Sequence, residues 1–250
     1  MKTFFYPLLS FLILTSTVAN AVPLVDFSIT AGQWQPEYSG KIGQNNNTAT
    51  LDDLGFDDDE HNVITAVLKH PVPVIPNIRL QHTTMETEAS GTATFTIRGT
   101  NYSASETVDT DLDLSHTDVT LFYSPLDNWV KFDLGLTGRY FGGEASFFGN
   151  TTNRTEEAQF DDWLPLVYAG ARFELPLSGL YIDATINTLS YDDNSLTDYT
   201  AAIGYGSNGL AVDLLVELGY RSFSLEVDDI DGFEGNVDIE GLYLSLGLRF

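Results

Sequence analysis

The chain has 250 residues, and its 11 Lys and Arg residues against 36 Asp and Glu residues give a formal net charge of −25 at pH 7. A field of that sign repels nucleic acid and attracts cations, so nucleic acid is not an expected partner. The chain contains no Cys, which excludes disulfide frameworks, thiolate metal sites and cysteine nucleophiles.

The first residues have the pattern of a secretory signal peptide. Lys2 precedes an apolar run that ends near Leu14, and Ala19-Asn20-Ala21 has the small-x-small form of a cleavage site. An uncleaved membrane anchor is the alternative, but the apolar run is short and contains Pro7 and Ser10. The sequence therefore predicts a signal peptide over residues 1–21 and a single exported domain over 22–250.

Ten segments of the exported part alternate apolar and polar residues, as strands with two different faces do. The first hairpin, over 61–88, has the weakest pattern, and without it the count falls to eight. The ten predicted strands are 24–34, 61–70, 77–88, 112–123, 129–141, 164–174, 180–190, 197–206, 210–221 and 239–250.

The connections between these strands also alternate. Four are short and rich in turn-forming residues, namely 71–76, 124–128, 175–179 and 206–209. The other five are polar, and all but one are long: 35–60, 89–111, 142–163, 191–196 and 222–238. Short inner turns and long outer loops with an even strand number are typical of outer-membrane barrels. We therefore predict an all-β fold, a closed antiparallel transmembrane β-barrel of ten strands with both termini periplasmic.

The last strand indicates which face meets lipid. Leu242, Leu244, Leu246, Leu248 and Phe250 occupy every second position, and the intervening residues are small, polar or charged. A soluble β-sandwich is the alternative, but a terminal Phe on an apolar-out strand is typical of bacterial outer-membrane barrels and similar to their assembly signal. Phe250 is therefore predicted to be that signal, with outer-membrane lipid and the barrel-assembly machinery as partners.

On the same alternation, charged residues of both signs face the barrel interior. Buried charges are tolerated when they are paired and hydrogen-bonded, so we expect lumen ion pairs that plug the barrel. A narrow passage for a small solute is the alternative, although ten strands leave little room. The predicted lumen set is Asp26, Lys69, Arg79, Asp118, Lys131, Asp133, Arg139, Arg172, Glu174, Asp183, Asp198, Asp213, Glu217, Arg221 and Arg249.

Two motifs could carry chemistry. His116 and Asp118 share a strand face, but Ser115 points to the opposite face, so the three cannot form one catalytic triad on a regular strand. Residues 229–238 match part of a calcium-loop spacing, but Val227 stands where the first ligand belongs. We therefore predict no catalytic, cofactor-binding or metal-binding residues.

The polar connections carry clusters of acids, such as Asp57, Asp58 and Asp59. Such clusters are most simply a solvated surface. They could also hold divalent cations at the cell surface, since hard oxygen ligands suit calcium and magnesium. Divalent cations and lipopolysaccharide are therefore expected as possible partners of the acidic loops.

Three segments carry a family resemblance: His70–Arg79, Leu112–Asp118 and Leu126–Gly135. They resemble a family of small outer-membrane β-barrel proteins of Gram-negative bacteria with no established activity. The resemblance implies an outer-membrane location and supplies no catalytic residues. The expected function is structural or that of a narrow passage, porin-like with acidic extracellular loops and without catalysis. The alternative is a barrel-embedded hydrolase acting on lipid or peptide at the outer leaflet.

Overall fold

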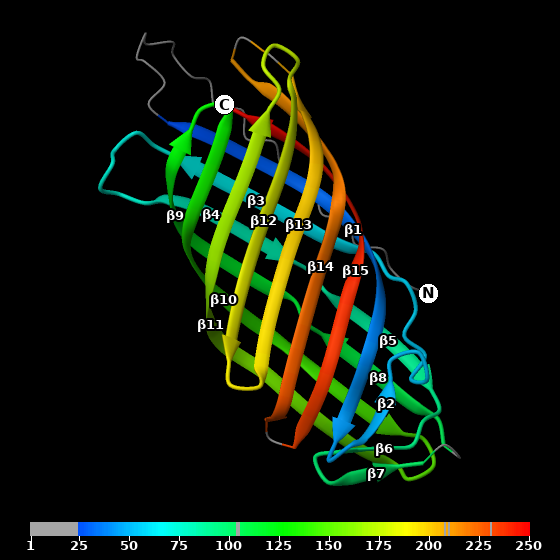
Figure 1. Ribbon diagram of the computed structural model, residues 1–250. Helices are drawn as coiled ribbons and strands as arrows, with labels where there is room; N and C mark the ends of the chain where they lie inside the picture. The colour runs from blue at the N-terminus through cyan, green and yellow to red at the C-terminus, as the bar shows by residue number, and fades with distance from the viewer. Residues whose placement is uncertain (1–24, 104–105, 208, 210, 231) are drawn as a thin grey trace.

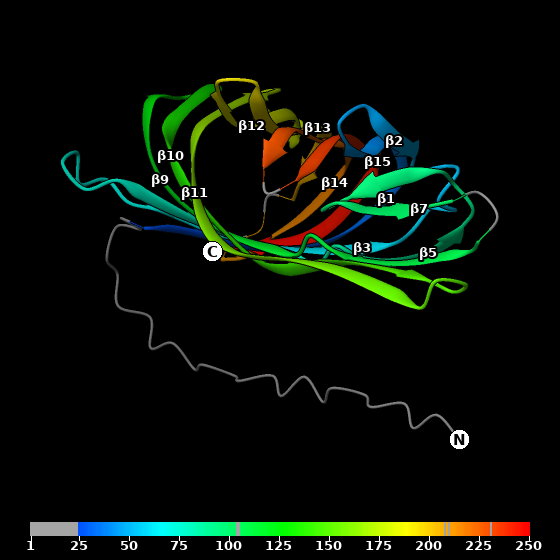
Figure 2. The same ribbon diagram turned by 90° about the horizontal axis from the view of Figure 1, so that it is seen from below.

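The computed structural model describes residues 25–103, 106–207, 209, 211–230 and 232–250, and these form an all-β structure. The predicted signal peptide lies outside the described residues. Ten strands form a ring, seen from the side in Figure 1 and from below in Figure 2. They are β1 (Asp26–Gln44), β3 (His61–Lys69), β4 (Asn77–Thr83), β9 (His116–Asp127), β10 (Val130–Gly149), β11 (Arg154–Glu174), β12 (Leu180–Tyr191), β13 (Asn194–Gly206), β14 (Asp213–Ile230) and β15 (Phe233–Arg249).

Backbone pairing closes the ring without a gap. The first and last strands pair antiparallel from Ser28↔Arg249 to Gly43↔Glu234, and β10 pairs β11 from Val130↔Phe173 onward. Closure leaves no strand edge unpaired where the wall meets lipid, as a membrane requires. The prediction of a ten-stranded closed antiparallel barrel is therefore confirmed, and the eight-stranded alternative is wrong because the 61–88 hairpin belongs to the wall.

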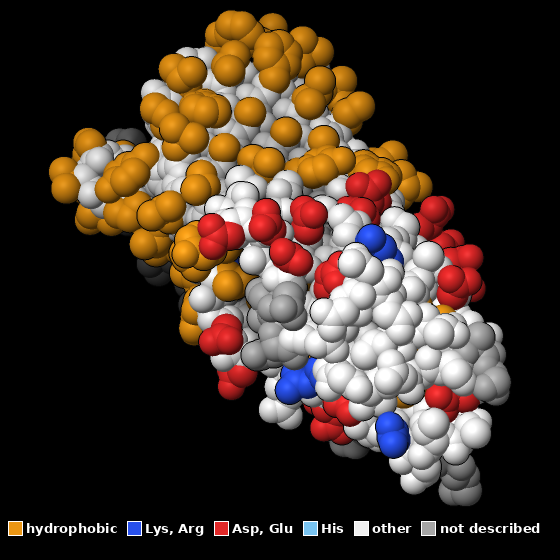
Figure 3. Space-filling view, turned by 60° about the horizontal axis from the view of Figure 1, so that its bottom comes forward, with side chains coloured by type: hydrophobic (Ala, Val, Ile, Leu, Met, Phe, Trp, Pro, Cys, Tyr) orange, Lys and Arg blue, Asp and Glu red, His pale blue; other side chains and the backbone are white. Residues whose placement is uncertain are grey.

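The outer face carries an apolar band next to the short turns. In Figure 3 hydrophobic side chains cover this part of the wall, and acidic side chains follow at its border. Leu134 and Ile182 are exposed there, as is Leu246 of the last strand, which was predicted to face lipid. Exposed aromatic side chains lie at both ends of the band: Tyr123, Phe173, Tyr205 and Phe250 beside the turns, and Tyr199 and Tyr220 at the far border. This arrangement is that of a membrane-spanning barrel with two aromatic girdles.

The prediction of long polar loops was wrong, because most of those residues continue the wall as strands. β10 and β11 extend past Phe141 as a hairpin that pairs up to Gly149↔Arg154, about 26 Å at roughly 3.3 Å per residue. Five shorter strands stand in the same outer part: β2 (Asn47–Thr50), β5 (Glu86–Gly91), β6 (Phe95–Ile97), β7 (Thr100–Tyr102) and β8 (Val108–Asp113). The predicted strand 77–88 divides accordingly, since β4 ends at Thr83 and β5 begins at Glu86.

In the outer part of the wall, side chains still alternate between the two faces, but the apolar ones now point into the barrel. Along β10, Lys131 and Asp133 point inward within the band, whereas Phe141 and Phe147 are the buried inward side chains beyond it. The reason is that this part of the wall meets water outside, so its apolar side chains turn into the barrel. There they form a core that the β6–β7 hairpin covers. Its large members include Trp34, Phe95, Ile97, Tyr102, Phe141, Phe147, Phe223 and Ile239.

Candidate functional site

Four groups of ion pairs line the barrel interior near the short turns. Lys69 Nζ lies 3.1 Å from Asp133 Oδ2, and Lys131 Nζ lies 2.9 Å from Glu174 Oε1. The remaining groups use arginine. Arg172 binds Asp183 at 2.8 Å and Glu217 at 3.4 Å, and Arg249 binds Asp213 at 2.7 Å. All these side chains are partly exposed, so water reaches the pairs.

Beyond this mouth lies a cavity of about 130 Å³. Asp26, Lys69, Lys131 and Arg249 line both the cavity and the opening between the short turns. The cavity therefore opens toward the short-turn end of the barrel. Its inner wall carries Arg79 together with polar, mostly neutral side chains: Thr65, Gln81, Tyr168, Thr200 and Tyr243.

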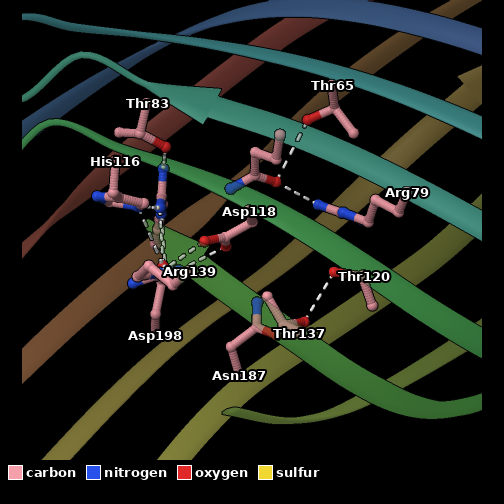
Figure 4. Close-up of polar contacts among 12 residues, drawn as sticks. Thr65, Arg79, Thr83, His116, Asp118, Thr120, Thr137, Arg139, Asn187 and Asp198 are labelled. Carbon is pink, nitrogen blue, oxygen red and sulfur yellow. Dashed lines mark hydrogen bonds and ion pairs between the residues drawn. The ribbon is translucent and has the colours of Figure 1, made fainter. Parts of the chain in front are cut away.

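A buried charge cluster closes the far end of the cavity. Arg139 donates to both carboxylate oxygens of Asp118 at 2.7 Å and to Asp198 Oδ2 at 2.6 Å, as Figure 4 shows. Arg221 binds the same Asp198 through Nε at 3.0 Å and Nη2 at 2.8 Å. None of the four side chains is more than 4% exposed. Two cations thus meet two acids, and the cluster is electrically balanced, which the interior of a barrel requires.

Two neutral residues complete the cluster. Thr83 Oγ1 accepts from Arg221 Nη1 at 3.0 Å, and His116 Nε2 lies 3.4 Å from Arg221 Nη2. His116 Nδ1 lies 2.9 Å from the carbonyl oxygen of Leu114. A carbonyl oxygen can only accept, so Nδ1 carries the proton and Nε2 is the acceptor toward Arg221. His116 is therefore neutral in this arrangement.

A second cross-lumen layer consists of hydroxyl and amide groups. Thr120 Oγ1 lies 2.7 Å from Thr137 Oγ1, which donates to Asn187 Oδ1 at 2.7 Å. These three residues join β9, β10 and β12, and each is buried. The sequence prediction considered only charges and missed them. They could have been found from the sequence, because Thr120 and Thr137 lie two residues from Asp118 and Arg139 and therefore on the same inward strand faces.

The cluster is a poor candidate for metal binding or catalysis. One ligand atom from each of His116, Asp118 and Asp198 lies within 4.8 Å of the others, but both carboxylates already bind arginine. Ser115 accepts a hydrogen bond from the amide of Met85 at 2.9 Å and does not join the His116 cluster. With His116 1% exposed, a substrate cannot reach this group.

Aromatic side chains seal the interior beyond the cluster. The Arg221 guanidinium lies 4.8 Å from the Trp34 ring centroid, and that of Arg139 lies 5.9 Å from the rings of both Phe141 and Phe223. Trp34 and Phe223 are fully buried. The cavity is therefore blind, open at the short turns and closed by charge, aromatic rings and apolar core in the outer part.

The structure departs in part from the expected lumen pairing. Among the described residues, Asp26 and Arg79 take part in no ion pair, although both were expected to. Lys131, Asp133 and Arg139 share one inward strand face and do form lumen ion pairs, each with a partner on another strand. Lys131 and Arg139 bind acids on neighbouring strands, and Asp133 binds Lys69 three strands away around the ring. Strand tilt decides which of these side chains reach each other.

Phe250, the predicted assembly signal, extends β15 beside the first strand. Its amide donates to the carbonyl of Phe27 at 2.8 Å, and the two rings stack with centroids 6.1 Å apart. Its side chain is 55% exposed on the apolar band. The partial calcium motif includes Asp231, which lies outside the described residues.

No protein-family model and no curated protein matches the chain. Three solved structures similar to it are bacterial outer-membrane proteins. The outer membrane protease OmpT from Escherichia coli has 10% identity and a TM-score of 0.48, with 95% of this chain and 99% of that one covered. A FadL homologue of Pseudomonas aeruginosa has 8% identity and a TM-score of 0.39, covering 92% and 90%. Neisserial surface protein A has 14% identity and a TM-score of 0.30, covering 89% and 95%.

Similarity at this level concerns the barrel fold alone. The closed ring and its apolar outer band make the chain a β-barrel protein of the bacterial outer membrane.

Proposed function

We propose that this protein is a sealed outer-membrane barrel whose function is carried by the β-structure outside the membrane. The short turns and the ends of β1 and β15 would face the periplasm, since outer-membrane barrels have short periplasmic turns. The long hairpins would then stand at the cell surface. The observation that carries this proposal is the buried Arg139–Asp118–Asp198–Arg221 cluster with the apolar core beyond it.

A structural role fits this interior better than a passage. A conducted solute would have to separate at least two guanidinium–carboxylate contacts of 2.6–2.8 Å and then cross a layer of buried aromatic rings. Uncompensated buried charges cost several kcal/mol each. The alternative of a barrel-embedded hydrolase has less support, because the His116 group is buried and its acids are bound to arginine.

Liposome swelling tests the seal. Liposomes that contain the refolded protein are expected to swell in isosmotic arabinose no faster than protein-free liposomes, because the cavity ends at the charge cluster. Folding is checked by the heat-dependent shift of the band on a gel, and a general porin serves as the positive control. Faster swelling in proportion to the folded protein would show that the barrel conducts.

The outer wall supplies the proposed contact with the cell surface. Two grooves on the water-facing wall, directly beyond the aromatic border, are lined by carboxylates, which we call the acidic belt: Glu37, Asp58, Asp59, Glu60 and Glu240 in one, and Glu86, Asp111, Asp113, Glu144 and Asp161 in the other. Tyr220 and Tyr140, at the aromatic border, donate to Glu240 at 3.1 Å and to Asp161 at 2.7 Å. The belt therefore stands at the height of the lipid headgroups.

Carboxylates at this height would repel the anionic groups of lipopolysaccharide. A divalent cation between the two removes that repulsion and finds the oxygen ligands it prefers. The proposed partners are therefore calcium or magnesium together with lipopolysaccharide, and the interaction weakens as salt screens the exposed charges.

Calorimetry with calcium tests the belt. Changing Asp58 and Asp59 to Asn is expected to reduce the calcium heat of the purified barrel in lipopolysaccharide micelles, since two belt ligands are lost. The matched control removes the same charge at the exposed tip of the β12–β13 hairpin, where Asp192 and Asp193 are changed to Asn. An equal loss of calcium heat in both variants would mean that calcium responds to the total negative charge and not to a site in the belt.

A further inference from the structure

The blind cavity contains one cation that differs from the others. Of the Lys and Arg side chains that line it, all but Arg79 bind a carboxylate within 3.1 Å. Arg79 instead donates to the amide oxygen of Gln81, which also accepts from Thr65 Oγ1 at 3.3 Å. Its positive charge is therefore uncompensated by any ion pair among the described residues.

No acid that lines the cavity forms an ion pair with Arg79. Asp133 binds Lys69, and Asp183 and Glu217 both bind Arg172. The fourth acid, Asp26, lies at the mouth, opposite Lys69 in the backbone register of β1 and β3. Arg79 thus has no carboxylate in direct contact, and the cavity gives an ion an open route to it from the short turns.

Hydroxyl groups that can donate to an anion line the cavity near Arg79. Tyr168 and Tyr243 line the same cavity with hydroxyl groups, and Thr65 and Gln81 stand beside them. A guanidinium fork with nearby hydroxyls suits a planar or tetrahedral oxyanion better than a spherical halide, because it binds two oxygens at once. At about 130 Å³ the space is below the roughly 300 Å³ of pockets for drug-sized ligands.

We propose that the cavity binds a small oxyanion, a phosphate or a short carboxylate, on Arg79 from the short-turn side. The ion neutralises the one cation of the cavity lining that forms no ion pair with a described residue. This binding does not depend on the acidic belt, which lies on the outer wall. The site is reached from the short turns and ends at the closure near Arg221, so an anion can bind in a barrel that conducts no solute.

Titration calorimetry with sodium phosphate, and separately with sodium acetate, tests the proposal on the refolded barrel at constant ionic strength. At least one of the two anions is expected to bind saturably. Arg79→Met should weaken that binding at least tenfold, and Arg79→Lys should weaken it less because the charge remains. Arg154→Met, which removes an exposed charge from the outer hairpin, should leave the affinity unchanged.

Tyr168→Phe provides a second variant that keeps every charge, and several-fold weaker binding is expected from the lost donor. Binding of phosphate alone or of acetate alone would support the site and identify the ligand class. The proposal is overturned if neither anion binds the folded wild-type barrel saturably. It is equally overturned if a folded Arg79→Met barrel binds the anion with wild-type affinity. If Arg79→Met does not fold, wild-type affinity of the folded Tyr168→Phe barrel overturns it.

Discussion

Asp198→Leu is expected to destabilise the folded barrel by about 3–5 kcal/mol, the usual cost of removing one partner from a buried ion pair. Asp198 is the acid that two guanidinium groups share, through contacts of 2.6 Å to Arg139 and 2.8 Å to Arg221. Leucine would leave Asp118 as the one carboxylate beside two buried cations. The measurement is the urea midpoint for reversible unfolding of the refolded protein in lipid vesicles.

Asp213→Leu is the matched control. It removes the partner of Arg249, but those two side chains are 17% and 31% exposed at the mouth, where water can solvate the remaining cation. The expected loss is below about 1 kcal/mol. Similar urea midpoints for Asp198→Leu and Asp213→Leu would mean that water reaches the inner cluster. The barrel would then not be sealed there, which contradicts the proposed function.

Much of the wall could be predicted from the sequence, because lipid imposes a strict alternation on every spanning strand. Leu134 and Leu136 had to face outward once Lys131 and Asp133 were excluded from lipid, and the structure places them so. The same constraint set the strand count, since each spanning segment repeats this pattern between turn-forming residues. A chain slipped by one residue would expose its charges to lipid.

The outer strands were missed because the pattern was interpreted for lipid alone. Beyond Tyr140 on β10 the inward positions change from charged to apolar, and beyond Tyr220 on β14 Phe223 becomes fully buried. The alternation itself continues. A change in which alternate position is apolar therefore marks where a barrel leaves the membrane and continues in water, and it can be found in the sequence.

The partners of the lumen charges could not be predicted. Arg139 meets Asp118 on the neighbouring strand but also Asp198, three strands away around the ring. Arg221 reaches Thr83, 138 residues distant. Such contacts depend on strand tilt and stagger, which alternation does not report. For the same reason nothing in the sequence marked Arg79 as the cation without an acid.

The position of the membrane along the barrel can be measured with two substitutions on one strand. Leu242 and Leu246 of β15 are the same residue type and are both 61% exposed. Leu246 pairs with Val216 inside the apolar band, whereas Leu242 pairs with Tyr220 at the aromatic border. The two sites therefore differ in depth and in little else.

Leu246→Arg is expected to destabilise the barrel by about 2–4 kcal/mol, and Leu242→Arg by about 0–1 kcal/mol, because the cost of a guanidinium falls from the middle of the bilayer to its surface. At Leu242 the long side chain also reaches the carboxylates of the acidic belt, which favours a cation there. Urea unfolding in vesicles measures both values. Equal costs would mean that both sites lie at one depth, and a larger cost at Leu242 would shift the membrane onto the outer strands. The expected order instead fixes the bilayer between the short turns and the belt, and leaves the long hairpins in water.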